Sequence, residues 1–207
     1  MFYQPQQTKD EIGLPFNPIK ALVVPRPIGW ISSLSPEGVA NLAPFSYFQM
    51  LIDDPPTLMF SAVGPHVEGD EKDTPYNVMR TGEFVYNMAT WELREQVNLS
   101  SAALERKVDE FDYAGLTKAP SNLVKVPRVA ESPVSMECLL REVIHLPSRL
   151  PHVQARLVIG EVVGIHIGDE VIHEGRVDIK KLKPIARLGY QDYAVIEEAF
   201  EIPRPGK

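Results

Sequence analysis

The stretch "IGWISSLSPEGVANLAPFSYFQM", residues 28–50, decides the fold because it predicts two strands joined by a tight turn. Residues 28–34 are rich in β-branched and aromatic side chains, which favour a strand. The "SPEG" at residues 35–38 has Pro at its second and Gly at its fourth position, as β-turns prefer. Residues 39–50 predict the second strand, so the whole stretch predicts a β-hairpin.

Pro44 interrupts the second strand of this hairpin. Proline has no N–H to donate to a neighbouring strand, so within sheets it is confined to edge strands and bulges. We therefore expect an edge or a bulge at Pro44, where a ligand could meet free backbone groups.

Further strands are predicted over residues 55–64, 83–89 and 152–168. Along the last of these, seven of the eight odd-numbered residues from Val153 to Ile167 are apolar, which predicts that the odd face is core. The even face carries glycines, which permit the bending that a small barrel needs. Strands outnumber helices and no βαβ alternation occurs. The sequence thus predicts a β-barrel with helical insertions rather than a doubly wound sheet.

Short helices are predicted over residues 75–81, after an N-cap at Thr74, from residue 91, after an N-cap at Thr90, and over residues 102–108. Prolines at positions 5, 15, 18, 25 and 27 predict an extended N-terminal segment. We therefore expect an extended arm at residues 1–24, one domain at 25–194 and a tail at 195–207.

The composition narrows the class of protein. The chain has 207 residues, 44% of them hydrophobic, and a net charge of −7 with no basic stripe, which argues against nucleic-acid binding. It has no apolar run of about 18 residues, so no membrane association is expected. There is no pattern of a secretory signal. The single cysteine, Cys138, excludes an intramolecular disulfide and fits a cytoplasmic location.

The residues "KDTP", 72–75, form the clearest candidate for a ligand site. Thr is a favoured N-cap and Pro is favoured at the first helical position, so a helix should begin here. Its unpaired N–H groups and the positive end of its dipole, together with Lys72, could hold a phosphate. The same residues also fit an ordinary capped helix with a solvated lysine.

Other candidate metal-binding and catalytic motifs are less informative about function. The five histidines show no helical i, i+4 pair and no cysteine partner, so no metal site is predicted. Hydrolase, Rossmann and P-loop motifs are absent. The carboxylates of "DEFD", 109–112, could form an acid–base pair, but a solvated helix end is the preferred interpretation.

Five blocks of the sequence resemble, in the same order, the flavin reductase-like, FMN-binding split-barrel proteins. They are "PRPIGWISSLSPEGVANLAPFSYF" (25–48), "DPPTLMFSAVG" (54–64), "KDTPYNVMRTGEFVYNMAT" (72–90), "DEFDYAGLT" (109–117) and "PIARLGYQDYA" (184–194). The resemblance points to the longer members: flavoredoxin-like proteins and reductase components of two-component monooxygenases.

This resemblance implies a mainly β fold, a six-stranded antiparallel Greek-key split β-barrel with a few short helices. It also implies a homodimer with FMN near the subunit interface, FAD being the less favoured flavin. Lys72 and Thr74 would hold the phosphate, with Ser61 and Ala62 beside it. The residues implied to line the ribityl chain and the isoalloxazine ring are Ser32, Ser33, Asn41, Ala43, Ser46 and Phe48.

One feature of the family is missing. Shorter flavin reductases often carry Gly-Asp-His just before the strand that matches "LVIGEVV", where this chain reads "VQAR", 153–156. The histidine thought to help with the nicotinamide is therefore absent there, and His166 and His173 are only weak candidates to replace it. Tyr190 stands where the family often has a second glycine.

The expected function is that of an FMN-binding oxidoreductase, an NAD(P)H-dependent flavin reductase that supplies a monooxygenase or another electron acceptor. Hydride would pass from the nicotinamide to flavin N5, and the protein would position and tune the cofactor. No catalytic acid or base is required, so no catalytic residue is assigned. Two alternatives stay open: a flavoredoxin-like FMN protein that transfers electrons without using NAD(P)H directly, and a flavin-free split-barrel binding protein.

Overall fold

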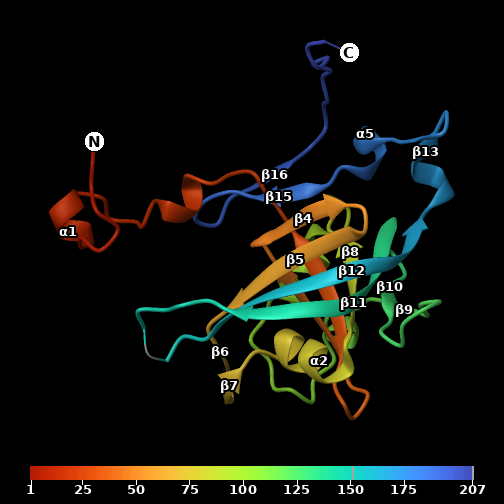
Figure 1. Cartoon of the computed structure of the whole chain (residues 1–207), viewed down its shortest axis with the longest axis horizontal. Coiled ribbons are helices and arrows are strands. Elements are labelled where there is room, and N and C mark those ends of the chain that lie inside the picture. Colours follow the sequence, from red (N-terminus) through yellow and green to blue (C-terminus); the bar gives the residue numbers. More distant parts are fainter. Residues whose placement is uncertain (151, 207) are drawn as a thin grey trace.

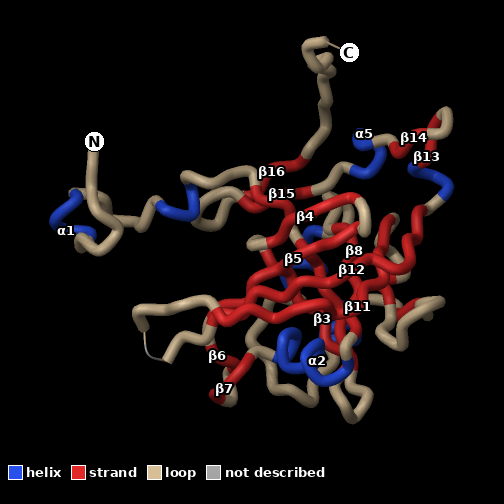
Figure 2. Tube along the Cα trace, in the orientation of Figure 1, coloured by secondary structure: helices blue, strands red, loops and turns tan. Residues whose placement is uncertain are grey.

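The computed structural model describes residues 1–150 and 152–206, and its largest element is a seven-stranded antiparallel sheet (Figures 1 and 2). The strands lie side by side in the order β3–β2–β8–β11–β12–β5–β4. Their bounds are β2 Gly29–Leu34, β3 Ala40–Phe45, β4 Phe48–Asp53, β5 Pro56–Val63, β8 Glu83–Met88, β11 Val134–His145 and β12 Ala155–Ile167. The mainly β split-barrel class is thereby confirmed.

The two edge strands of this sheet follow each other directly in the chain. β3 and β4 are separated by only Ser46 and Tyr47, yet they pair at opposite edges, β3 with β2 and β4 with β5. The Ser61 N–H donates to the Tyr47 carbonyl at 2.8 Å and holds the crossing segment against β5. The sheet therefore curls until its edges approach without closing. The strand expected over residues 39–50 is thus two strands, and β11 is not among the strands expected from the sequence. The sheet has seven strands, not the six that the resemblance implies.

Four smaller sheets surround the barrel. β1 (Arg26–Pro27), β15 (Ile185–Arg187) and β16 (Tyr193–Val195) form one, and three two-stranded pairs form the others. The pairs are β6 Pro65–His66 with β7 Gly69–Glu71, β9 Lys118–Ala119 with β10 Arg128–Val129, and β13 Ile172–His173 with β14 Arg176–Val177.

The helices are short, and several differ from the expected ones. They are α1 Lys9–Ile12, η1 Ile19–Ala21, α2 Asp73–Thr81, α3 Arg94–Leu99, α4 Glu110–Ala114, η2 Asp169–Val171 and α5 Ile179–Leu182. The N-terminal arm, drawn away from the barrel in Figure 1, thus contains two helical turns as well as extended chain. Thr90 is not an N-cap, because it pairs with Pro184 and α3 begins later. No helix covers residues 102–108; α4 follows them instead, capped by Asp109.

Aromatic rings fill the barrel interior. The ring of Phe60 lies 4.9 Å from that of Phe45 and 5.5 Å from that of Phe84, centroid to centroid. Phe48 stacks on Tyr86 with centroids 4.8 Å apart. A Cβ at Gly160 would lie 2.3 Å from the Phe84 ring, so this glycine makes room for the packed core.

The orientation expected for β12 is wrong. Val158, Gly160 and Val162 on the even face are buried, whereas Ile165 and Ile167 on the odd face are exposed. The even face carries glycines because large rings from neighbouring strands occupy the interior. The regular apolar odd face therefore lies on the outside of the barrel.

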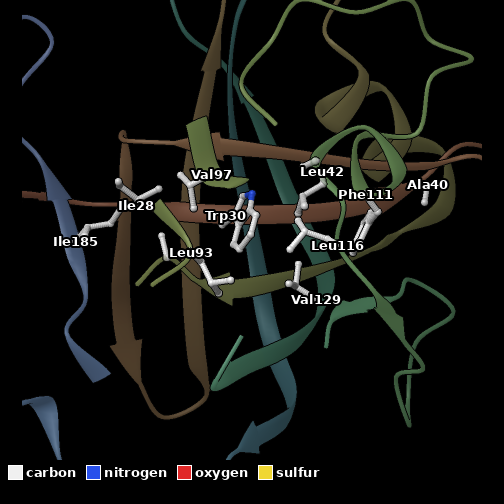
Figure 3. Packing of buried hydrophobic residues seen from close by; sticks show 12 residues of the cluster. Ile28, Trp30, Ala40, Leu42, Leu93, Val97, Phe111, Leu116, Val129 and Ile185 are labelled. Carbon is white, nitrogen blue, oxygen red and sulfur yellow. The ribbon is translucent and has the colours of Figure 1, made fainter. Parts of the chain in front are cut away.

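A second hydrophobic cluster lies between the β2–β3 hairpin and helices α3 and α4 (Figure 3). Trp30 is fully buried at its centre, and its indole N–H donates to the Ser100 hydroxyl at 2.9 Å. Phe111 from α4 and Val97 from α3 pack into the same cluster. This packing holds α4, and with it Glu110, against β3.

No helix among the described residues is long and apolar enough to span a lipid bilayer.

Candidate functional site

Asn41 on β3 lies at the centre of a buried polar network. Its amide nitrogen donates to Glu110 Oε2 at 3.0 Å, and its oxygen accepts from Thr74 Oγ1 at 2.8 Å and Ser33 Oγ at 3.2 Å. Asn77 Nδ2 donates in turn to Ser33 Oγ at 3.1 Å. All five residues are buried. The network therefore fixes the first turns of α2 against the β2–β3 hairpin.

The N-terminus of α2 begins one residue after Lys72. Lys72 is the N-cap with extended backbone (φ −58°, ψ 148°), so the expected cap at Thr74 is wrong. The Thr74 hydroxyl proton is instead donated to Asn41, because Thr74 lies within the first turn and points toward β3. The first N–H groups of a helix have no partner within it and carry the positive end of its dipole. Half-buried Lys72, which forms no ion pair with a described residue, adds a full positive charge.

Asp73, the first residue of α2, places a carboxylate close to this positive charge. Its two oxygens lie 3.0 Å from His66 Nε2 and 3.5 Å from Arg106 Nε. Burial raises the pKa of Asp73, and the attraction of His66 and Arg106 opposes that rise. The Arg106 guanidinium thus supplies a cationic partner for this carboxylate, with the His66 ring beside it, which leaves Lys72 available to an anion.

Glu110 is a second carboxylate at the site, and it is 6% exposed. Its Oε2 accepts hydrogen bonds from the Leu42 N–H and the Asn41 amide, both at 3.0 Å. Burial raises the pKa of Glu110 to about 7, although these two hydrogen bonds lower it. Glu110 therefore titrates near neutral pH and orients Asn41 from behind.

A cleft of about 150 Å³ opens beside the α2 N-terminus. Its walls come from β3, from the segment that leads into α2, and from the residues that follow α3. The residues that line it include Asn41, Ala43, Pro44, Lys72, Thr74 and Glu110, together with the segment 100–104. Four predicted cofactor residues, Asn41, Ala43, Lys72 and Thr74, thus share one cleft.

A larger cavity of about 610 Å³ continues from this cleft. The two share Pro44 and Ser101, and Ser46 lines the larger one. Pro44 lies on edge strand β3, which confirms the edge expected there. The cleft and the larger cavity together run along edge strand β3 from Asn41 to Ser46, so an elongated ligand could extend from Lys72 to Ser46.

The donors at the cleft suit the phosphate end of a flavin nucleotide. An ammonium group and free helical N–H groups are ligands that phosphates prefer. Ser33 lies behind Asn41 and reaches the cleft only through it. The site is therefore compatible with FMN, with Lys72 and the backbone of α2 as the phosphate contacts.

Besides Ser33, four predicted cofactor residues line neither space. Ser32 donates its hydroxyl to the Pro127 carbonyl at 2.7 Å, and Ala62 packs in the barrel core. The Ser61 N–H is used by Tyr47, and Phe48 stacks on Tyr86. A role for these four in binding flavin stays a prediction.

The histidines offered for the nicotinamide lie elsewhere. His166 Nε2 is 2.5 Å from Glu137 Oε1, and Glu137 also accepts the N–H groups of residues 122–124. His173 is exposed in the β13–β14 hairpin. Among the described residues, no group of three or more His, Cys, Asp and Glu could hold a metal ion. Cys138 is fully buried, and burial raises the pKa of its thiol.

Glu110 is a residue of the candidate site that the sequence does not indicate, since "DEFD" is typical of a solvated helix end. The Asp109 carboxylate caps α4 by accepting the Phe111 N–H at 2.9 Å. Glu110, Phe111 and Ala114 then form the buried face of the helix. This i, i+1, i+4 spacing was the available signal.

The chain is similar to a known protein family and to several known proteins. The family described as "Flavin reductase like domain" matches residues 21–192. An uncharacterized protein of Halalkalibacterium halodurans is 38% identical over 183 residues, which covers 88% of this chain and 87% of the other.

Two solved structures are similar over nearly the whole chain. Nitrilotriacetate monooxygenase component B from Bacillus cereus superposes with a TM-score of 0.86 at 32% identity, covering 98% of each chain. The 2-nitrobenzoate 2-nitroreductase of Pseudomonas fluorescens superposes with a TM-score of 0.83 at 27% identity, covering 100% of this chain and 96% of the other.

Proposed function

The chain belongs to the flavin reductase-like domain family and is a flavin-related oxidoreductase, and from that premise we propose that it binds FMN and reduces it with NAD(P)H. Reduced flavin or its electrons would then pass to a partner such as a monooxygenase or another acceptor. The similarity to a monooxygenase component B supports this role.

One observation carries the proposal: Lys72 and the α2 N-terminus meet edge strand β3 at a cleft that continues past Pro44. The N-terminus supplies N–H groups and Lys72 a charge for the phosphate. At β3 the sheet ends, so its outer backbone groups have no further strand to pair with. The planar ring would lie along this edge.

FMN, when bound, supplies the hydride chemistry, and the residues of the chain bind and orient it. Lys72 would hold the phosphate, while Glu110 and Asn41 keep the first turn of α2 in place. Backbone N–H groups near the ring would stabilise the negative charge that builds up on reduction, since a site that excludes water strengthens such contacts. No side-chain acid is needed for the hydride step.

Anaerobic mixing of the purified protein and FMN with NADH or NADPH tests this function. We expect the visible absorption band of the flavin to bleach within minutes of mixing with at least one of the two nucleotides. If FMN binds but neither nucleotide bleaches it within minutes, the flavoredoxin-like alternative replaces the reductase. If no FMN binds, both give way to the flavin-free alternative.

A homodimer is part of the proposal, and an apolar outer face of the barrel supports it. Ile144 and Leu157 are cross-strand partners, as are Met59 and Ile159, so all four lie on the face opposite Phe60 and Val158. None of the four is fully buried, and Ile144 is 37% exposed. The exposed Glu142 of β11 also pairs with Ile159, so a charge borders these four apolar residues. Exposed apolar groups gathered on one face support a protein–protein contact there. A cytoplasmic location also remains a proposal, resting on the single reduced cysteine.

A further inference from the structure

The cleft beside the N-terminus of α2 contains a carboxyl group that no ion pair balances. The ionisable residues that line the cleft are His66, Lys72, Asp73 and Glu110. Asp73 lies 3.5 Å from Arg106 Nε, whereas no described residue forms an ion pair with Glu110. A phosphate bound by Lys72 and the first N–H groups of α2 would therefore share the cleft with an unbalanced carboxyl group.

The groups that donate hydrogen bonds to this carboxyl group are neutral. Glu110 Oε2 accepts from the Leu42 N–H and from the Asn41 side-chain amide, each at 3.0 Å. Neutral donors suit either form of the carboxyl group, because a proton on Oε1 leaves Oε2 able to accept. Glu110 can therefore gain or lose a proton while it keeps Asn41 and strand β3 in place.

The elements that surround Glu110 bring few charges to it. Strand β3 carries no charged residue, and neither do residues 100–104, which follow α3 and line the cleft. Other charged groups nearby pair with one another: Arg94 with Glu95 on α3, and Asp109 and Asp112 of the α4 region with Lys118. The proton on Glu110 is thus sensitive to any anion that Lys72 binds.

Burial places the proton equilibrium of Glu110 near neutral pH. It raises the pKa of Glu110 to about 7, and the negative charge of Asp73 adds to this rise. A further negative charge in the same cleft would raise the pKa more, because like charges disfavour the ionised form. A phosphate and a proton should therefore favour each other's binding, by the same factor in both directions.

We propose that FMN binding makes Glu110 take up a proton, so that the cleft holds FMN more tightly below neutral pH than above it. Above pH 7 the complex binds more protons than the free protein does, so the affinity for FMN falls as the pH rises. Glu110 touches no reacting atom, and its role is to regulate retention of the flavin. The inference rests on the proposed function, because it requires the phosphate of FMN in this cleft.

Titrations of FMN at pH 6.5 and pH 8, with flavin fluorescence as the measurement, test this coupling. A phosphate monoester has its second pKa at about 6, so FMN is mostly dianionic throughout this range. We expect the wild type to bind FMN roughly four- to eightfold more weakly at pH 8 than at pH 6.5. Glu110→Gln should remove this difference. Asp112→Asn should keep it and is the matched control, because Asp112 is exposed on the same helix outside the cleft.

A count of protons gives a second readout. Isothermal titration calorimetry of the wild type with FMN at pH 7.5, in two buffers of different ionisation enthalpy, should show uptake of about half a proton or more per FMN. His66 also lines the cleft, and histidine is a residue that titrates near neutral pH. His66→Gln should retain both effects, so this variant assigns the proton if Glu110→Gln does not fold.

The outcomes separate this inference from the proposed function. FMN binding with equal pH dependence in the wild type and in Glu110→Gln overturns the coupling and leaves the FMN site in place. FMN binding without proton uptake does the same, as does a pH dependence that His66→Gln abolishes. Absence of FMN binding at both pH values overturns the inference and the proposed function together.

Discussion

Glu110 makes the stability of the fold depend on pH. Its folded pKa of about 7 lies above the ordinary value of 4.5 because the side chain is buried. A carboxyl group with a raised folded pKa binds more protons in the folded than in the unfolded state between these values. Its contribution to stability is therefore complete below pH 4.5 and is lost as the pH rises through 7.

Replacing Glu110 by Gln should remove this pH dependence. Because one pKa unit corresponds to about 1.4 kcal/mol, the free energy of unfolding of the wild type should fall by on the order of 3 kcal/mol relative to Glu110→Gln between pH 4.5 and 8. Urea unfolding of both proteins across this range measures the difference. A constant difference at all pH values would show that Glu110 is ionised throughout.

Glu137 should affect the pH dependence of stability in the direction opposite to Glu110. Its burial alone would raise the pKa, but the N–H groups of residues 122–124 and His166 outweigh that effect and lower the pKa to about 2. The stabilisation by Glu137 should be present above pH 4.5 and be lost as the pH falls toward 2.

We expect Glu137→Gln to lower the free energy of unfolding by about 1.5–3 kcal/mol at pH 7, as loss of hydrogen bonds to a charged group does. The variant should also be less sensitive to acid than the wild type. Thermal unfolding at pH 7 and pH 3 measures both; an acid sensitivity equal to that of the wild type contradicts the assignment.

At the scale of the element, the packing of β12 against the barrel core depends on one glycine. A Cβ at Gly160 would lie 2.3 Å from the Phe84 ring, so Gly160→Ala should destabilise the protein by about 1–3 kcal/mol through overpacking. Gly164 on the same strand is the matched control, because a Cβ there would meet its neighbours at 3.4 Å or more. Denaturant unfolding of the two variants should separate them, and equal losses would show that strand propensity rather than Phe84 sets the cost.

The same element shows where sequence reasoning reached its limit. Periodicity gave a strand at 152–168 but assigned the wrong face, because both faces of β12 are partly apolar and only Phe84, distant in sequence, determines which face needs glycine. The edge at Pro44 was predictable because it follows from a local property of proline. Thr74 was misplaced as a cap because its hydroxyl pairs with Asn41, a contact between distant residues. Local chemistry thus predicted a helix start at Lys72 and Thr74, which line the cleft, whereas the position of Glu110 beside Asn41 depends on tertiary packing.

At the scale of the whole molecule, a substitution can test whether the outer barrel face forms the interface of the proposed homodimer. Ile159→Lys places a charge within the apolar face formed with Met59, Ile144 and Leu157, so it should convert the dimer to monomer at micromolar concentration. Val177→Lys is the control, because Val177 is exposed on the β13–β14 hairpin. Sedimentation velocity measures the mass of each. A wild type that sediments as a monomer contradicts the dimer, and an Ile159→Lys dimer contradicts this interface.

Titration of FMN into the wild type, Lys72→Ala and Lys180→Ala tests the central claim most directly, with flavin fluorescence as the measurement. Lys72 caps α2 at the cleft, whereas Lys180 is exposed on α5 and serves as the control. Loss of a charge-assisted phosphate contact costs roughly 1.5–3 kcal/mol, or about ten- to a hundred-fold in affinity. We predict that Lys72→Ala weakens FMN binding by this factor while Lys180→Ala binds as the wild type does. Equal affinity of all three proteins for FMN would contradict the placement of the phosphate at the start of α2.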